Sequence, residues 1–239
     1  MTRASPSVEG ALAGACGAAL GAAAGLFIAM PVPGAFVGGL NGLISGRRGI
    51  YAWSTPKGSA AFVLDSTWAL ATTAAGLVAH AVAATQPDAG YAPRLSERQN
   101  RHVYARGFRV RKGFAVTLGN VVNGAGDVGR ARRAKLITDH EDVHIWQARG
   151  FGPAYPVLYG GWMAGAAAAA AAAWLSGRRS QPFGRLVESF AYYLNPFEWW
   201  AYSRDDHWPP SGKLDGVGWR RPIVRSFASR ADRSGGAPI

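Results

Sequence analysis

The sequence predicts a mainly α-helical membrane protein with a small β-hairpin and an N-terminal helical hairpin. Three observations support this fold class. Stretches without Asp, Glu, Lys or Arg cover residues 10–46, 66–84 and 154–175, and the last two are long enough to cross a bilayer as helices. Glycines recur every fourth residue within the first stretch. Between the second and third stretches, β-branched and aromatic residues gather around a short turn, which favours strands.

The composition favours an anionic partner, because the formal charge is +12 over 239 residues. Arginine, alanine and glycine all have GC-rich codons, so part of this charge reflects base composition. Nucleic-acid binding requires a basic face interleaved with aromatic residues, and none is visible, so we expect no nucleic acid as partner. Anionic lipid headgroups are the partner we expect instead. The single cysteine, Cys16, excludes an internal disulfide.

Residues 1–48 form the first predicted domain, a glycine-zipper hairpin that is transmembrane or re-entrant. Glycine at every fourth position leaves one helix face bare, so that a second helix or a second copy of the chain can approach closely in lipid. We therefore also expect a homo-oligomer through this face. Pro31 and Pro33 separate the two arms, and the second arm is short for a span. A cleaved signal peptide is the alternative, although Arg3 alone would form its basic region. The glycines concerned are Gly10, Gly14, Gly17, Gly21, Gly25, Gly34, Gly38, Gly42 and Gly46.

Residues 49–204 form the second predicted domain, which we expect to be embedded in the membrane. Asp65 is predicted to N-cap a spanning helix over 66–84, and a second spanning helix is predicted over 154–175. A β-hairpin is expected over about 102–122, with its turn at 111–113. The run RARRAK at 130–135 is interpreted as a basic turn facing solvent or headgroups.

The motif with the clearest chemistry is His140-Glu141-x-x-His144 on a helix predicted over about 139–149. Thr138 or Asp139 would cap this helix. Residues four apart share a helix face, so both imidazoles can bind one ion. Two neutral imidazoles and a carboxylate suit Zn²⁺ and leave a position for water. The metal would lower the pKa of that water, and Glu141 is predicted to take its proton as the catalytic base.

Such a site needs a third protein ligand, and the sequence leaves two candidates open. No histidine follows at the spacing found in the extended H-E-x-x-H-x-x-G-x-x-H motif, since position 147 is Gln and position 150 is Gly. A downstream carboxylate is the usual substitute. Only Glu188 and Glu198 lie in a suitable helical context, and Glu198 also fits the N3 position of a helix capped by Asn195.

Several motifs together resemble small bacterial membrane-associated zincin-like proteins of uncharacterised function. These motifs are HEDVHIWQARGFGPAYPVLY, NPFEWWAY, the earlier DSTW at 65–68 and LGNVV at 118–122, and they cover roughly residues 50–205. The resemblance implies a zincin-like α+β core, a location in the bacterial cell membrane, and Glu198 as the third zinc ligand beside His140 and His144. Asp142 departs from the apolar or aromatic residue usual at its position.

The sequence thus indicates a zinc-dependent hydrolase of the metallopeptidase type at the membrane surface, with a peptide or protein as substrate. The alternative is a non-catalytic glycine-zipper protein with a structural metal site or a polybasic lipid-binding role. Basic segments at 94–135 and 204–232 place the metal site on the cytoplasmic side by the positive-inside rule. Residues 205–239 are predicted to be a basic, weakly ordered tail.

Overall fold

The computed structural model describes residues 5–108, 113–177 and 182–205, so the predicted tail and the turn at 111–112 lie outside the described residues. The fold is mainly α-helical with one small mixed sheet, which confirms the predicted class at this level. The chain divides into two units, Met1–Tyr155 and Pro156–Ile239. The division at 48 and 204 that the sequence suggested stays a prediction.

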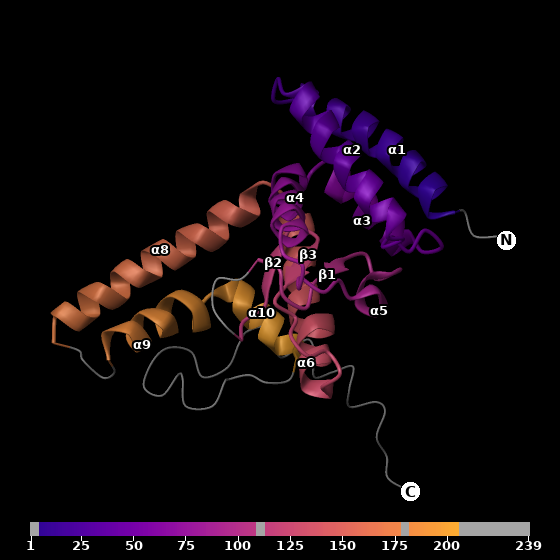
Figure 1. Ribbon diagram of the computed structural model, residues 1–239. Coiled ribbons are helices and arrows are strands. Elements are labelled where there is room, and N and C mark those ends of the chain that lie inside the picture. Colours follow the sequence, from indigo (N-terminus) through magenta and orange to yellow (C-terminus); the bar gives the residue numbers. More distant parts are fainter. Residues whose placement is uncertain (1–4, 109–112, 178–181, 206–239) are drawn as a thin grey trace, which may run out of the picture. The chain divides into compact units, whose positions relative to one another are not determined.

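Helices α1 (Pro6–Leu26) and α2 (Pro31–Arg47) lie side by side as an antiparallel hairpin (Figure 1). Ser5 caps α1 through the backbone N–H of Val8. Glycines line the contact face, where the backbones of the two helices meet directly. A Cβ placed on Gly17 would overlap the carbonyl of Gly38, and one on Gly21 would overlap that of Gly34. The four-residue glycine spacing therefore produces the close approach of these two helices.

Two neighbouring glycines of α1 test this packing. Gly17→Ala is expected to destabilise the protein by about 1–3 kcal/mol, because the new methyl group would push against the Gly38 backbone. Gly14→Ala is the matched control, since its nearest neighbour atoms would lie at an ordinary 3.4 Å. It should be neutral, or stabilising by up to about 1 kcal/mol through helix propensity. Thermal unfolding in a non-ionic detergent measures both, and equal effects would contradict the packing account.

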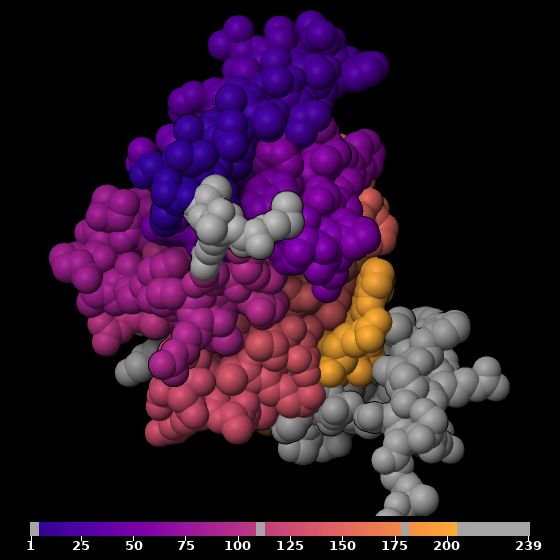
Figure 2. All heavy atoms as spheres, turned by 90° about the vertical axis from the view of Figure 1, so that its right-hand side faces the viewer, coloured from indigo at the N-terminus to yellow at the C-terminus, as the bar shows by residue number. Residues whose placement is uncertain are grey.

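The far end of this hairpin is apolar and projects from the rest of the first unit (Figure 2). Phe27 is 92% exposed and Val32 is 77% exposed. At the other end, buried Glu9 accepts hydrogen bonds from Arg98 and from Trp53, which tie the base of the hairpin to the following loops. Helices α1 and α8 are both long and apolar enough to cross a membrane. Large apolar side chains exposed together at such a tip are typical of a membrane contact.

The helix predicted over 66–84 begins later, as α4 (Leu70–Ala84). The residues before it form a separate helix, α3 (Pro56–Ser66), which meets α4 at an angle of 88°. Neither helix alone is long and apolar enough to cross a membrane, whereas the two counted together are. The prediction that Asp65 caps a helix is wrong. Asp65 is the penultimate residue of α3, and its buried carboxylate forms an ion pair with Arg149.

The predicted hairpin over 102–122 is replaced by a three-stranded mixed sheet with the order β1-β3-β2. Strand β1 (His102–Val103) pairs in parallel with β3 (Val121–Asn123), and β2 (Val116–Leu118) pairs antiparallel to it. The tight turn of the actual hairpin lies at Gly119 and Asn120, where Gly119 has a φ of +56°. The predicted turn at 111–113 implied one unbroken strand from there to residue 122, which is wrong because Gly119 allows the chain to reverse within it.

One helical segment runs from α6 (Ala131–Lys135) through the π-helical turn η1 (Leu136–Glu141) into α7 (Asp142–Phe151). The predicted start near Thr138 or Asp139 is therefore wrong, and the RARRAK run is helical rather than a turn. Arg133 explains the difference, since its guanidinium donates to the carbonyl oxygens of Ala125 and Gly124 and holds α6 on the sheet loop. Gly152, with a φ of +53°, ends α7.

The second unit contains most of α8 (Ala154–Leu175), then α9 (Phe183–Glu188), the π-helical turn η2 (Ser189–Tyr193) and α10 (Pro196–Asp205). The side chain of Asn195 accepts from the backbone N–H of Phe197, so the predicted cap of α10 is confirmed. The side chains of helix α8 are exposed or half-buried, except for Ala170, which is its buried residue. The short helix α5 (Pro93–Ser96) belongs to the first unit.

Candidate metal centre

The two histidines of the motif face each other on consecutive turns of the η1–α7 segment. His140 Nε2 lies 3.2 Å from His144 Nε2, and both side chains are buried. Two nitrogens bound to one tetrahedral Zn²⁺ at about 2.0–2.1 Å would lie about 3.3–3.4 Å apart. The separation of the two imidazoles therefore fits a shared metal ion. π-Helical turns, such as the one that carries His140, are frequent at functional sites.

His144 is held by two polar neighbours in the same unit. Its Nδ1 lies 2.9 Å from Oε1 of Gln147 and 3.3 Å from the hydroxyl of Tyr155. Because an amide oxygen only accepts, Nδ1 carries the proton and Nε2 keeps its lone pair for a cation. Hydrogen bonds of this kind orient metal-binding histidines and fix their tautomer. Gln147, one turn beyond His144, thus orients the His144 ring and fixes its tautomer.

Glu141 follows His140 in the chain, is buried, and faces strand β2. Its Oε2 accepts a hydrogen bond of 2.7 Å from the hydroxyl of Thr117. Its Oε1 has no hydrogen-bond partner among the described residues. One oxygen of Glu141 is therefore anchored, while the other is available to accept a proton.

One partly buried and one fully buried ion pair fix the position of helix α7. Near its start, Asp142 accepts from Arg101 at 2.6 Å. Near its end, Arg149 binds both carboxylate oxygens of Asp65 at 2.8 Å. The hydroxyl of Tyr51 also donates to Asp65, and burial together with this carboxylate raises the pKa of Tyr51, so the hydroxyl keeps its proton. Helix α7 is thus held near both ends by ion pairs, of which the one at its C-terminal end lies in the core.

Glu198 lies on α10 in the second unit, where it is 2% exposed. Its Oε1 accepts a hydrogen bond of 2.7 Å from the hydroxyl of Tyr159 on α8. His140, His144 and Glu198 make a group of buried side chains that could hold a metal ion. Glu188, the other carboxylate left open by the sequence, is not in this group.

Several residues outside α7 contact the candidate ligands, helix α7 or its ion-pair partner Asp65. Trp68 of DSTW donates to the carbonyl oxygen of Gly150 at the end of α7. Asn120 of LGNVV donates to the carboxylate of Asp65. Of the two tyrosines in FGPAYPVLY, Tyr155 contacts His144 and Tyr159 contacts Glu198.

Sequence reasoning missed three residues of this centre. The partner of Glu141, Thr117, carries no motif signal and is found only through the fold. The helix predicted over about 139–149 ends at Arg149, and nothing in the sequence links this residue to Asp65. Tyr155 could have been found, since it lies in the same motif as His144.

Comparisons with protein-family models, with curated proteins and with solved structures found no match to this chain.

Proposed function

We propose that this protein is a zinc-dependent hydrolase of the metallopeptidase type that acts at a membrane surface. The observation that carries the proposal is the pair of Nε2 atoms 3.2 Å apart, with the buried Glu141 directly after His140 in the chain. Two imidazoles that can share a metal ion, a fixed tautomer and a nearby carboxylate are the parts that water activation needs.

Zn²⁺ is the metal that this donor set favours. Imidazole suits zinc, copper, iron and nickel, whereas magnesium and calcium prefer sites made of oxygen. Three protein ligands, His140, His144 and Glu198, would leave one tetrahedral position open, as in catalytic rather than structural zinc sites. The hydrogen bond from Tyr159 would orient the Glu198 carboxylate for this role.

When bound, the metal would polarise the substrate carbonyl and lower the pKa of a water molecule. Glu141 would accept a proton from that water on its Oε1, while Thr117 holds Oε2 in place. Glu141 would then return the proton to the leaving amine of the peptide bond. Gln147, which accepts from Nδ1 of His144, would keep Nε2 of this ring directed at the metal.

A peptide in extended form is the substrate that the sheet favours. Strand β2 lies at one edge of the three-stranded order β1-β3-β2, and it carries the Thr117 that contacts Glu141. Peptides commonly bind by adding a strand to such an edge, where main-chain hydrogen bonds give affinity. A substrate on β2 would therefore run past the catalytic carboxylate.

We also propose that the protein resides in a cell membrane and contacts anionic headgroups. The two apolar helices α1 and α8 and the exposed hairpin tip support membrane residence. The net charge of +12 supports attraction to anionic lipid. By the positive-inside rule the metal centre would face the cytoplasm.

A fluorogenic peptide library tests the activity directly. Protein in lipid nanodiscs should hydrolyse part of the library, lose this activity when a strong chelator removes the metal, and regain it with stoichiometric Zn²⁺. Hydrolysis that continues undiminished after removal of the metal would contradict a metal-dependent mechanism.

A structural metal site is the second candidate, because His140 and Glu198 are each only 2% exposed and structural zinc sites are closed. In that case chelation would lower the stability of the protein, and no peptide of the library would be cleaved by the zinc-loaded form.

A further inference from the structure

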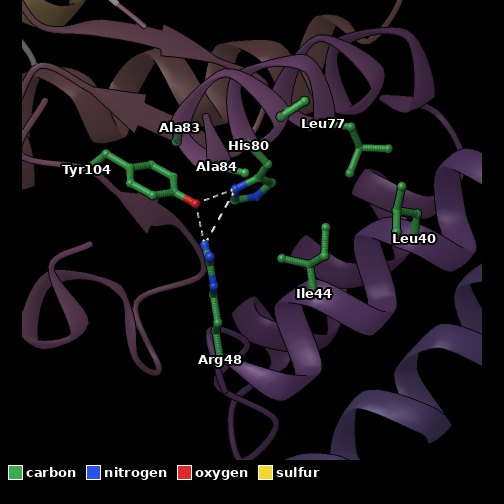
Figure 3. Close-up of a pocket in the computed structure, with 9 residues that line it drawn as sticks. Leu40, Ile44, Arg48, Leu77, His80, Ala83, Ala84 and Tyr104 are labelled. Atoms are coloured by element: carbon green, nitrogen blue, oxygen red, sulfur yellow. Dashed lines mark hydrogen bonds between the residues drawn. The ribbon is translucent and has the colours of Figure 1, made fainter. Parts of the chain in front are cut away.

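A cavity of about 360 Å³ lies between α2 and α4 in the first unit, apart from the histidine pair (Figure 3). Its volume falls in the range of about 300–1,000 Å³ that is typical of small-molecule sites. One side is apolar and the other is polar, and Figure 3 shows the polar side chains converging on one point. The apolar side is lined by Leu40, Ile44 and Leu77, and the polar side by Arg48, His80 and Tyr104.

Arg48 supplies a positive charge to the polar side. Its Nη1 donates to the hydroxyl of Tyr104 at 2.6 Å, and its guanidinium lies 4.1 Å from the centre of the Tyr91 ring. Among the described residues, no carboxylate forms an ion pair with Arg48. A half-buried guanidinium held by aromatic groups without a counter-ion favours an anion from outside the chain.

His80 supplies a hydrogen-bond donor that lacks an acceptor. Because Arg48 donates to the Tyr104 oxygen, the Tyr104 O–H is free to donate to His80 Nδ1, which lies 2.9 Å away. The neutral ring then carries its proton on Nε2. This nitrogen is buried and has no hydrogen-bond partner among the described residues. A headgroup oxygen in the cavity would provide the missing acceptor.

We propose that this cavity binds a single-chain anionic amphiphile of the fatty-acid type. The carboxylate would bind Arg48 and accept from His80, and the alkyl chain would lie along Leu40, Ile44 and Leu77. The membrane that the hairpin tip and α1 favour would deliver such a ligand to the opening between α2 and α4. This inference is independent of the hydrolase proposal, since none of these residues belongs to the metal centre.

Radiolabelled decanoate is the probe, measured by equilibrium dialysis against the full chain in nanodiscs of zwitterionic lipid, with empty nanodiscs subtracted. We expect saturable binding of one decanoate per chain. Arg48→Gln should weaken this binding about tenfold or more, because it removes the charge that faces the carboxylate. Arg47→Gln is the matched control, since Arg47 is exposed on the same helix and does not line the cavity, and it should change binding less than twofold.

A second pair of variants tests the cavity without touching a charge. Ala81 lines the cavity at an exposed position of α4, so Ala81→Trp should block decanoate, whereas Ala71→Trp, exposed elsewhere on α4, should not. Decanol should bind at least tenfold more weakly than decanoate. Equal binding of decanol, equal binding of acetate, unchanged binding by Arg48→Gln, or no saturable binding above empty nanodiscs would each overturn the proposal.

Discussion

Glu141→Gln is expected to abolish peptide hydrolysis, with a loss of at least about 10³-fold, while the zinc content stays at the wild-type level. Glutamine keeps the size of the side chain and can still accept the hydrogen bond from Thr117, but it cannot take a proton from water. General base catalysis alone contributes about 10²–10⁴-fold to such reactions. The measurement is turnover of the cleaved library peptide beside metal analysis of the same preparation.

The control for this variant is Asp88→Asn. Asp88 pairs with Arg106 on the surface of the same unit, and its side chain is 61% exposed, so this change should leave turnover and zinc content unaltered. Should Glu141→Gln retain turnover within about threefold of the wild type, Glu141 is not the base. A simultaneous loss of zinc would instead make Glu141 a ligand, which the proposed role excludes.

Arg149→Met is expected to destabilise the protein by about 3–5 kcal/mol. The Arg149 guanidinium and the Asp65 carboxylate are 1% and 2% exposed, so removing one partner leaves a buried charge without compensation. Since Arg149 also donates to the carbonyl oxygen of Asn100, the variant loses a further buried hydrogen bond. Denaturant unfolding in a non-ionic detergent measures the change.

Two further variants test whether this loss of stability comes from the uncompensated buried charge of Asp65. Arg106→Met removes one partner of the exposed pair with Asp88 and should cost at most about 1 kcal/mol. The double variant Asp65→Leu with Arg149→Met removes both buried charges and should recover a large part of the loss. If the double variant is as unstable as Arg149→Met alone, the cost does not come from the uncompensated Asp65 charge.

The sequence predicted correctly those features that depend on residues close together in the chain. The glycine spacing predicted the face on which α1 and α2 meet, because a missing side chain is visible in the sequence. The four-residue spacing of His140 and His144 predicted a shared helix face. Asn195 followed by Pro196 predicted the start of α10, since both residues have strong positional preferences there.

The errors arose where contacts between distant residues decide the structure. Asp65 was predicted as a cap because Ser66 and Thr67 follow it, yet its carboxylate meets Arg149, which lies 84 positions further along the chain. The strand pairing was wrong because β1 joins β3 in parallel across an intervening loop, and register of this kind has no local signal. The contact of Thr117 with Glu141 was not predicted for the same reason, because it depends on the position of strand β2 in the folded chain.

Metal analysis of the purified wild type beside His144→Ala, Glu198→Ala and Glu188→Ala tests the central claim most directly. We expect about one zinc ion per chain in the wild type and in Glu188→Ala, and a loss of zinc in both His144→Ala and Glu198→Ala. A wild type without zinc, or zinc retained in full when His144 or Glu198 is replaced, would contradict a site made of two histidines and this glutamate.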